Sequence, residues 1–537
     1  MAMSKASYTP NFRSKSQRLN CIISQDRNTL QSSSSPATWG HRITGKAHGG
    51  DDGRRYDGAL GLTSIKAGHP FVGKTSATMA VIQQAAMMAI TLAHTPDRPS
   101  DGDLFDALKA GIAAALPALA ATGAGRLVSL SLTISADHLD TLEVPGAECL
   151  WLAPGLTLHA SGKAIRIDGD LGRHFQKIRA DWRVLGDGAA RPIGFFTFPP
   201  PNSPDLPTLW VPQVVIRRDA DTATVTFSMR HDGGTVAEMT RRWTAVLRSM
   251  LTAPATQRGG GGDICSITAC PDARQWAGRV EATTRAIADG RFDKVVLARR
   301  FDILMARPPV VADLVRRLAA INPQCRSFAL PYRRGSTVAS TPEILAAKRG
   351  RLVVAHALAG TAKRHDSETD SQAAAARLLA SPKERHEHEV VVATIAAQLR
   401  SLCETVQCPP RPEVMALRFV QHLWTPISGT LPPDLGLLDV VAQLHPTPAV
   451  LGAPREAAAR WLDQVGERRD GLYSGVAGWI DADGDGDAAV VLRSAHIEGC
   501  GAVLWAGAGI VADSLPEAEL AETEMKMATM LEVLRPL

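Results

Sequence analysis

The spacing of apolar and polar positions divides the chain into stretches of different character. Apolar residues in the first stretch are mostly good helix formers, which predicts helices at 77–93 and 103–119. Short β-branched and aromatic runs then follow between 126 and 230, broken by Gly, Pro and Asp. These runs predict antiparallel strands and hairpins. A further helix is predicted at Val236–Leu251, and the Gly-rich segment at 252–263 predicts a flexible connection after it.

The same alternation resumes after this connection. Strands such as KVVLARRFDI and AAVVLRSAHI are interleaved with predicted helices at 273–290, 311–320, 370–379, 384–402 and 454–466. Strand-rich and helix-rich stretches thus alternate in both halves without a short regular period. We therefore predict an α+β fold with two large, mostly antiparallel sheets and outer helices.

Composition narrows the class of protein. A chain of 537 residues with 45% hydrophobic residues can bury a large core. Its net charge of +5 is small against 59 basic and 54 acidic side chains, so we expect no nucleic-acid partner. No apolar run of about 18 residues occurs, so we expect no membrane-spanning helix. The eight cysteines lack zinc-site spacing and are predicted to be reduced thiols in a cytosol-like compartment.

The first 50 residues differ from the rest of the chain. They contain nine Ser, seven Lys or Arg and one acidic residue, Asp26. That bias is typical of an organellar transit peptide, but a disordered leader or a start assigned too far upstream would have the same composition. In each case residues 1–65 lie outside the catalytic fold. The predicted location is cytoplasmic, or the plastid stroma if the segment is a transit peptide.

Two titratable residues follow the Gly-rich segment in apolar surroundings. Lys294 stands at the start of an apolar strand, where desolvation would allow it to act as a neutral base. Glu343 follows a proline near a turn, and a poorly hydrated cleft would keep it protonated as a general acid. Taken alone, each also fits an ordinary surface charge.

Two pairs of carboxylates stand at the same spacing on separate predicted helices. Glu384 and Glu387 are three residues apart, as are Glu519 and Glu522. Residues at this spacing share one face of a helix. If the fold brings the two faces together, they offer hard oxygen donors suited to Mg²⁺. Solvated helix faces are the alternative.

Other segments suggest contacts with a ligand. The small residues 506–509 predict a turn where backbone N–H groups approach a carboxylate, and Arg493 and Lys526 are candidate partners for one. The segment at 481–492 begins like a calcium-binding loop. However, Leu492 stands where a bidentate Glu is needed and strands flank the segment, so we predict a hairpin turn.

Beyond these residues, the order of motifs resembles that of the chorismate-utilising enzymes. The motifs are KVVLAR, TPE, ALAGTAKR, SPKERHEHEVVV, HLWTPISGTL, LHPTPAVLGAPREAA, GLYSGVAGW, GDGDAAVVLRSA and AGAGIVADSLPEAELAETEMKMATML. That family includes isochorismate synthases, salicylate synthases and the large subunits of anthranilate and aminodeoxychorismate synthases. The resemblance covers about residues 270–537. It implies an α/β sandwich in which 66–263 is the variable N-terminal half and 264–537 the chorismate-binding catalytic region.

The resemblance also implies roles for residues at matching positions. Lys294 matches the base that activates water, and Glu343 matches the acid that protonates the departing hydroxyl. The implied Mg²⁺ ligands are Glu387 and Glu522, supported directly or through water by Glu384 and Glu519. The implied substrate-binding residues are Gly360, Thr361 and His422 along the ring, with Tyr473, Arg493, Gly507, Gly509 and Lys526 near the carboxylates. Thr341 stands where Ser is usual in the family, and Glu384 stands where Asp is common. How the residues around the Mg²⁺ ligands are arranged is therefore left open.

The expected activity is Mg²⁺-dependent, reversible conversion of chorismate to isochorismate. The lysine at 294 favours water over ammonia as nucleophile, so no obligatory glutamine amidotransferase is expected. A salicylate synthase, which adds pyruvate elimination, is the alternative. A non-catalytic binding protein is disfavoured because Lys294, Glu343 and the metal carboxylates are all present. A monomer or homodimer is expected, and the pathway that uses the product (menaquinone, siderophore or salicylate) stays open.

Overall fold

Strands from the N-terminal half and the C-terminal half pair within the same sheets. The computed structural model describes residues 109–115, 117–118, 125–134, 144–186, 191–201, 203–219, 222–231, 235–252 and 263–536. The leader at 1–65 and the helix expected at 77–93 lie outside these residues. The expected flexible connection at 252–263 is described only at its two ends.

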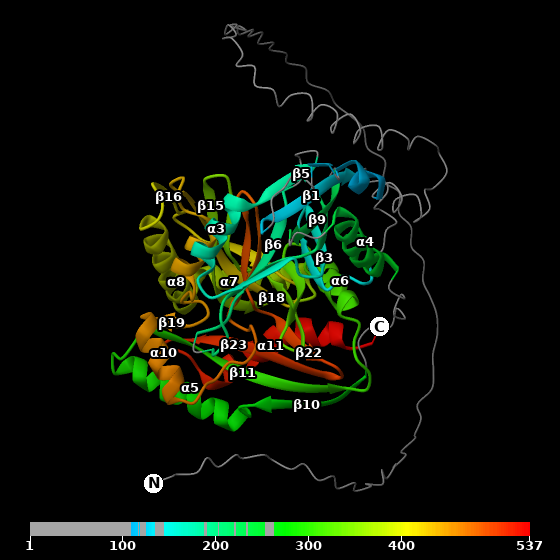
Figure 1. Cartoon of the computed structure of the whole chain (residues 1–537). Helices are drawn as coiled ribbons and strands as arrows, with labels where there is room; N and C mark the ends of the chain where they lie inside the picture. The colour runs from blue at the N-terminus through cyan, green and yellow to red at the C-terminus, as the bar shows by residue number, and fades with distance from the viewer. Residues whose placement is uncertain are drawn as a thin grey trace, which may run out of the picture. The chain divides into compact units, whose positions relative to one another are not determined.

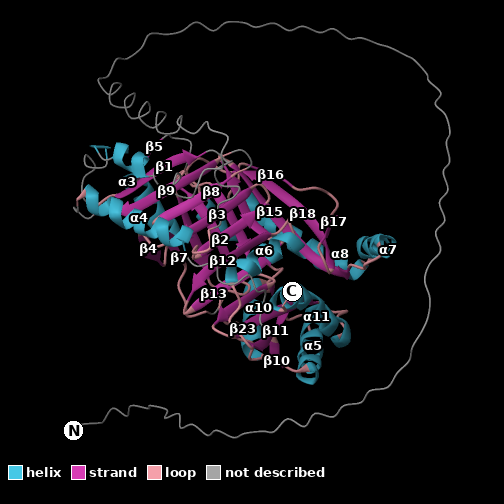
Figure 2. Cartoon of the chain, turned by 90° about the vertical axis from the view of Figure 1, so that its right-hand side faces the viewer, coloured by secondary structure: helices cyan, strands magenta, loops and turns pink. Residues whose placement is uncertain are grey.

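In the described part of the chain, the first sheet contains thirteen strands. All of their pairings are antiparallel except that between β1 and β5. In spatial order the strands are β10 (Ile264–Cys270), β11 (Lys294–Met305), β23 (Gly501–Ile510), β22 (Ser494–Glu498), β13 (Gly335–Thr341), β12 (Arg326–Tyr332), β2 (Cys149–Ala153), β3 (Leu156–Ser161), β8 (Val214–Arg218), β9 (Ala223–Arg230), β1 (Leu127–Ile134) and β5 (Arg183–Gly186), with β19 (Gly452–Ala453) beside β11. Figure 2 shows this succession from β5 and β1 at one end to β10 at the other.

The second sheet has ten described strands, all antiparallel to their described neighbours. Their spatial order is β16 (Thr405–Gln407), β18 (Val420–Thr430), β15 (Leu352–Lys363), β14 (Ile344–Arg349), β21 (Gly486–Val490), β20 (Val476–Asp481), β6 (Ile193–Phe198), β7 (Thr208–Val211) and β4 (Ile165–Asp168), with β17 (Glu413–Ala416) beside β18. The two large, mostly antiparallel sheets confirm the predicted architecture.

The two sheets pack face to face around a common apolar core. Trp151 and Phe328 of the first sheet stack there with ring centroids 4.9 Å apart, and Phe195 and Trp479 of the second sheet belong to the same buried cluster. Helices cover the outer faces, as Figure 1 shows for α8 and α11. The result is a helix, sheet, sheet, helix sandwich, in which each sheet buries both faces.

Each helix contributes an apolar face to a sheet or to a neighbouring helix. α8 and α9 cover the second sheet, whereas α6 and α11 cover the first. Residues 109–115 and 117–118, within the helix expected at 103–119, are helical. The other described helices are α3 (Leu171–Asp181), α4 (Val236–Thr252), α5 (Ala273–Ala288), α6 (Val311–Ile321), α7 (Glu368–Ala380), α8 (Pro382–Arg400), α9 (Leu437–Leu444), α10 (Arg455–Gln464) and α11 (Pro516–Leu534). None of these is long and apolar enough to cross a membrane.

Two helices important for the site begin with strong sequence signals. In α8, the hydroxyl of Ser381 accepts a hydrogen bond from the backbone N–H of Glu384, and Pro382 occupies the first turn. Pro516 likewise starts α11, with Glu517 and Glu519 in its first turn. A proline at the first position and carboxylates near the positive end of the helix dipole both favour helix initiation there.

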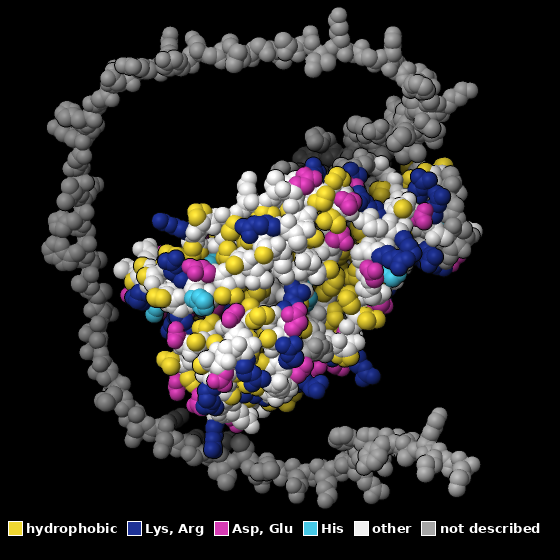
Figure 3. Space-filling view, turned by 90° about the vertical axis from the view of Figure 1, so that its left-hand side faces the viewer, with side chains coloured by type: hydrophobic (Ala, Val, Ile, Leu, Met, Phe, Trp, Pro, Cys, Tyr) yellow, Lys and Arg dark blue, Asp and Glu magenta, His cyan; other side chains and the backbone are white. Residues whose placement is uncertain are grey.

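Basic and acidic side chains are interspersed on the molecular face that Figure 3 presents. This face therefore presents no patch of a single charge sign.

Candidate active site

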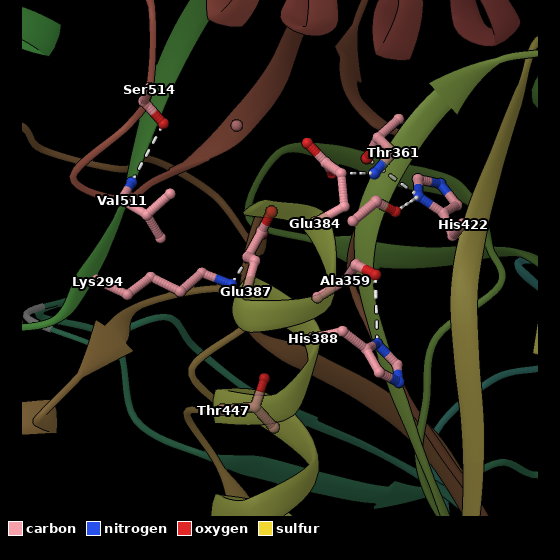
Figure 4. A network of polar contacts seen from close by, with 12 residues as sticks. Lys294, Ala359, Thr361, Glu384, Glu387, His388, His422, Thr447, Val511 and Ser514 are labelled. Carbon is pink, nitrogen blue, oxygen red and sulfur yellow. Dashed lines mark hydrogen bonds and ion pairs between the residues drawn. The ribbon is translucent and has the colours of Figure 1, made fainter. Parts of the chain in front are cut away.

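Lys294 lies at the start of β11, as predicted, and its side chain is fully buried. Its Nζ atom lies 2.9 Å from Oε1 of Glu387, which projects from α8 (Figure 4). Burial raises the pKa of Glu387, but the ammonium groups of Lys294, Lys526 and Lys383 together lower that pKa below its usual value. The fold thus joins a strand of the first sheet to a helix on the second through a buried ion pair.

Glu343 lies where the chain passes from β13 in the first sheet to β14 in the second. Its side chain is 2% exposed, and Thr447 Oγ1 lies 3.4 Å from its Oε1. Burial raises the pKa of Glu343 to about 8, although Lys294 and the Thr447 hydroxyl act in the opposite direction. The carboxyl is therefore protonated at neutral pH, as a general acid requires.

The two carboxylate pairs lie in the first two turns of their helices. Glu384 and Glu387 come from α8, and Glu519 and Glu522 come from α11. Thr361 joins the two helices, since its backbone N–H donates to Glu384 Oε2 at 2.9 Å and its hydroxyl lies 3.4 Å from Glu522 Oε1. The predicted faces therefore approach each other across β15.

Two lysines neutralise part of this negative charge. Lys383 Nζ lies 2.9 Å from Glu519 Oε1 and 3.4 Å from Glu384 Oε1. Lys526 Nζ contacts Glu522 one turn earlier in α11. Burial and then repulsion from Glu522 raise the pKa of Glu519 to about 7, while burial and then Glu387 raise that of Glu384. With Lys294, three lysines therefore contact the four carboxylates.

The donor chemistry of this cluster fits a hard divalent cation. Glu519 is 1% exposed, yet its Oε2 has no hydrogen-bond partner. A buried carboxylate oxygen without a partner is costly, and a cation would satisfy it. Among the described residues, however, no three acidic, His or Cys side chains converge at metal-binding spacing in the arrangement seen here. The Mg²⁺ site thus stays a prediction, supported by the donor set.

The residues expected along the ring lie together between β15 and β18. His422 Nδ1 lies 3.1 Å from the carbonyl oxygen of Gly360 and 3.2 Å from Thr361 Oγ1. Figure 4 shows Thr361 between Glu384 and His422. Burial lowers the pKa of His422 well below its usual value, and the charges of Arg493 and Lys526 act in the same direction.

Arg493 lies at a second crossing between the sheets, after β21 and before β22. Its φ of 48° is unusual for a residue other than glycine, and its carbonyl accepts a hydrogen bond from the backbone of Ser340. The Arg493 Nη2 atom lies 2.9 Å from His422 Nε2. Strained backbone such as that of Arg493 is often found at functional sites.

Tyr473 stacks on Trp505 with ring centroids 5.7 Å apart.

Gly507 and Gly509 lie within β23, so the turn expected at 506–509 is wrong. The backbone there is extended and pairs with β11. Their small size matters in a different way. A Cβ atom at Gly507 would lie 2.6 Å from the Tyr473 hydroxyl oxygen, and one at Gly509 would collide with Glu387 Oε1. These glycines leave room for two site side chains, and the Gly507 carbonyl accepts a hydrogen bond from Lys526 at 2.9 Å.

One cavity gathers most of the predicted site. Its lining includes the acid, one metal-site carboxylate and all the expected substrate-binding residues: Glu343, Glu387, Gly360, Thr361, His422, Tyr473, Arg493, Gly507, Gly509 and Lys526. Three predicted residues contact this lining: Lys294, Glu384 and Glu522. Glu519 is joined to Glu384 through Lys383. All fourteen positions therefore belong to one connected region of the molecule.

Three residues of this region were not singled out from the sequence. Lys383 bridges the two helices, Thr447 contacts the candidate acid, and Trp505 stacks on Tyr473. Lys383 directly precedes Glu384, and Thr447 lies in the HPTPAVLG motif. The sequence thus contained Lys383 and Thr447 beside recognised motifs, but only the fold shows that they contact Glu519 and Glu343.

The calcium-like segment forms the predicted hairpin turn between β20 and β21. Asp481 Oδ1 accepts hydrogen bonds from the backbone of Asp483 and Asp485. Other carboxylates of the segment form ion pairs with basic side chains, such as Asp485 with Lys348 at 2.8 Å. These acidic groups stabilise the turn.

Comparison with known proteins identifies the family. A family model described as chorismate binding enzyme matches residues 118–535. The isochorismate synthase DhbC of Bacillus subtilis is 36% identical over 273 residues, which is 49% of this chain and 69% of that relative. The salicylate biosynthesis isochorismate synthase of Pseudomonas aeruginosa is 33% identical over 444 residues, 76% of this chain and 90% of that relative.

Solved structures have the same fold. DhbC from Bacillus anthracis superposes with a TM-score of 0.60 at 27% identity, covering 74% of this chain and 98% of its own. The menaquinone-specific isochorismate synthase MenF from Escherichia coli gives a TM-score of 0.67 at 24% identity, covering 79% and 100%. The ordered motifs, the sandwich and these matches agree: the chain belongs to the chorismate-binding enzyme family.

Proposed function

We propose that this protein is an isochorismate synthase, an isomerase that converts chorismate to isochorismate. The observation that carries the proposal is the buried Glu343 carboxyl, whose pKa burial raises, in a cavity whose wall includes the partner of the buried Lys294. An acid and a base in a poorly hydrated cleft suit the replacement of one hydroxyl by another. The relatives named above as isochorismate synthases support the same assignment.

The proposed reaction moves a hydroxyl across the ring of chorismate. Lys294 pairs with Glu387 as an ammonium and must first lose a proton to solvent. Its neutral amine then accepts a proton from water as the water oxygen bonds to C2. Glu343 donates its proton to the C4 hydroxyl, which leaves as water while the ring double bonds shift. One water enters and one leaves, so product and substrate are isomers. Because bonds of the same kind form and break, the reaction is reversible.

Other side chains of the cavity hold the substrate in place. Arg493 and Lys526 supply positive charge for its carboxylates, and Tyr473 supplies a hydroxyl, whose pKa burial raises to about 12. Glu387 and Glu522 would hold Mg²⁺, with Glu384 and Glu519 in support. A bound Mg²⁺ would supply positive charge for the ring carboxylate as a Lewis acid.

Product analysis tests the proposal directly. The full chain is incubated with chorismate, with Mg²⁺ in one reaction and EDTA in another, and the products are separated by chromatography. We expect isochorismate with Mg²⁺, little or none with EDTA, and none with Glu343→Gln. Salicylate with pyruvate would assign a salicylate synthase instead. A folded protein that leaves chorismate unchanged with Mg²⁺ would contradict the proposal.

A further inference from the structure

The Arg493 guanidinium contacts a buried histidine in the cavity. Its Nη2 atom lies 2.9 Å from Nε2 of His422, while Nδ1 of the same ring lies 3.1 Å from the carbonyl oxygen of Gly360. His422 is 4% exposed, and it projects from β18 into the cavity that Arg493 also lines. The imidazole therefore fills the space between the guanidinium and the backbone of β15.

The contact with arginine fixes the protonation of this ring. A guanidinium has only N–H donors, so Nε2 of His422 must accept and carries no proton. The single ring proton is then on Nδ1, where it can be donated to the Gly360 carbonyl oxygen. The nearby charges of Arg493 and Lys526 also oppose a positive imidazole. His422 is therefore neutral in this arrangement.

A neutral acceptor holds a cation without cancelling its charge. Among the described residues no carboxylate lies within ion-pair distance of Arg493. Arg469 gives the contrast, because its guanidinium lies 2.9 Å from the buried carboxylate of Glu467 and also donates to two backbone carbonyls. Arg469 is thus neutralised within the scaffold, whereas Arg493 keeps its charge for a ligand.

We propose that His422 is a positioning residue that aims the Arg493 guanidinium at a substrate carboxylate while leaving its positive charge intact. A carboxylate at position 422 would hold the arginine equally well but would compete with the substrate for it. This inference rests on the proposed function for the identity of the substrate, chorismate. It assigns His422 an electrostatic role in binding, separate from proton transfer at the reacting carbons.

An isosteric pair of variants separates charge from shape. His422→Gln keeps a neutral oxygen acceptor for Arg493, whereas His422→Glu places an anion there with the same side-chain length. We expect His422→Glu to bind chorismate about 10- to 100-fold more weakly than His422→Gln, as expected for loss of a charged hydrogen bond. The loss should appear mainly in KM, since the contact exists before the reaction starts.

Calorimetry in a Glu343→Gln background measures chorismate binding without turnover. Equal affinities for the His422→Gln and His422→Glu forms would overturn the proposal. So would a His422→Gln enzyme that loses kcat while KM stays unchanged, because that would mean proton transfer. Adding Arg493→Gln should abolish the difference between the two forms, since no guanidinium is left to neutralise. A contrast that persists without Arg493 would also count against the proposal.

A replacement variant and a check on activity keep failure of this proposal distinct from failure of the proposed function. If His422→Glu does not fold, His422→Asn replaces it, because its shorter amide cannot reach Nη2 of Arg493 and should bind chorismate more weakly than His422→Gln. Equal binding by those two amides would overturn the proposal. If the wild-type chain binds chorismate but forms no isochorismate, the proposed function fails. The role of His422 is then decided by the binding contrast alone.

Discussion

Lys294 and Glu387 hold opposite charges in a place with almost no water. Replacing Lys294 by Met removes the proposed base and leaves Glu387 buried without its ammonium partner. We expect the rate of isochorismate formation to fall about 10²- to 10⁴-fold, the usual contribution of a positioned base. Steady-state kinetics with chorismate and Mg²⁺ measure this effect.

Lys348 provides a matched control for that variant. It is 7% exposed and pairs with Asp485 at 2.8 Å, in the hairpin region outside the cavity. Lys348→Met removes a lysine from a comparable ion pair, so it should lower stability without changing kcat. If Lys348→Met and Lys294→Met reduce activity equally, loss of folding rather than loss of a base explains both.

The raised pKa of Glu343 has a cost in stability that depends on pH. Its pKa is about 8 in the folded protein against 4.5 ordinarily, so between these values the folded state binds a proton that the unfolded state lacks. The folded state therefore loses stability as pH rises, by about 1.4 kcal/mol per unit, until the carboxyl ionises in both states.

Glu343→Gln removes this titration and keeps the shape of the side chain. We expect the variant to be inactive and to gain stability relative to wild type as pH rises from 4.5 to 8, with no further gain above. Urea unfolding of both proteins at several pH values measures the difference. A difference that does not change with pH would show that Glu343 is not buried in its protonated form.

At the scale of elements, Lys383 links the first turns of α8 and α11. Its ammonium contacts Glu519 and Glu384, whose attraction raises the pKa of Lys383 above its usual value although burial acts in the opposite direction. Lys383→Met leaves Glu519 buried with no counterion. We expect a loss of about 3 kcal/mol in the free energy of unfolding, measured in urea with EDTA present.

Two comparisons test whether the lost ion pair causes that effect. Arg385→Met, two residues further along α8 on its exposed side, removes a surface pair with Glu389 and should change stability by less than about 0.5 kcal/mol. The double variant Lys383→Met with Glu519→Met should regain most of the loss, because no isolated charge remains. A double variant as unstable as Lys383→Met would contradict this account.

The sequence predicted the elements that combine strong periodicity with clear ends. The helices carrying the Glu pairs and the strand starting at Lys294 were confirmed, because their patterns are long and their first residues distinctive. α3 and α9 were not predicted. α9 has only eight residues, and its five buried residues lie on one face, but so short a segment does not repeat the helical period often enough to be recognised.

The turn expected at 506–509 failed for a physical reason. Gly usually favours turns, but here β23 needs small residues because Tyr473 and Glu387 lie against its surface. Such a requirement comes from residues distant in sequence. The pairing of His422 with Arg493 was hidden for the same reason, since the two lie on strands or crossings that only the tertiary fold brings together.

At the scale of the whole molecule, both halves of the chain are needed to complete each sheet. β12 pairs with β2 in the first sheet, and β20 pairs with β6 in the second. Phe328 and Trp479 from the C-terminal half are buried against Trp151 and Phe195 from the N-terminal half. The proposed catalytic residues all follow residue 263, yet their supporting strands depend on partners that precede it.

This interleaving predicts the behaviour of the two halves when they are separated. A fragment of residues 264–537 alone would expose the pairing edges of β12 and β20 and the apolar core between the sheets, so we expect it to aggregate. A protease site introduced between α4 and β10 should have a different effect, because cleavage there breaks one peptide bond and leaves every strand pairing in place. The cleaved halves should elute together in gel filtration and retain isochorismate formation. A fragment 264–537 that unfolds cooperatively and converts chorismate by itself would refute the structural dependence of the site on the first half.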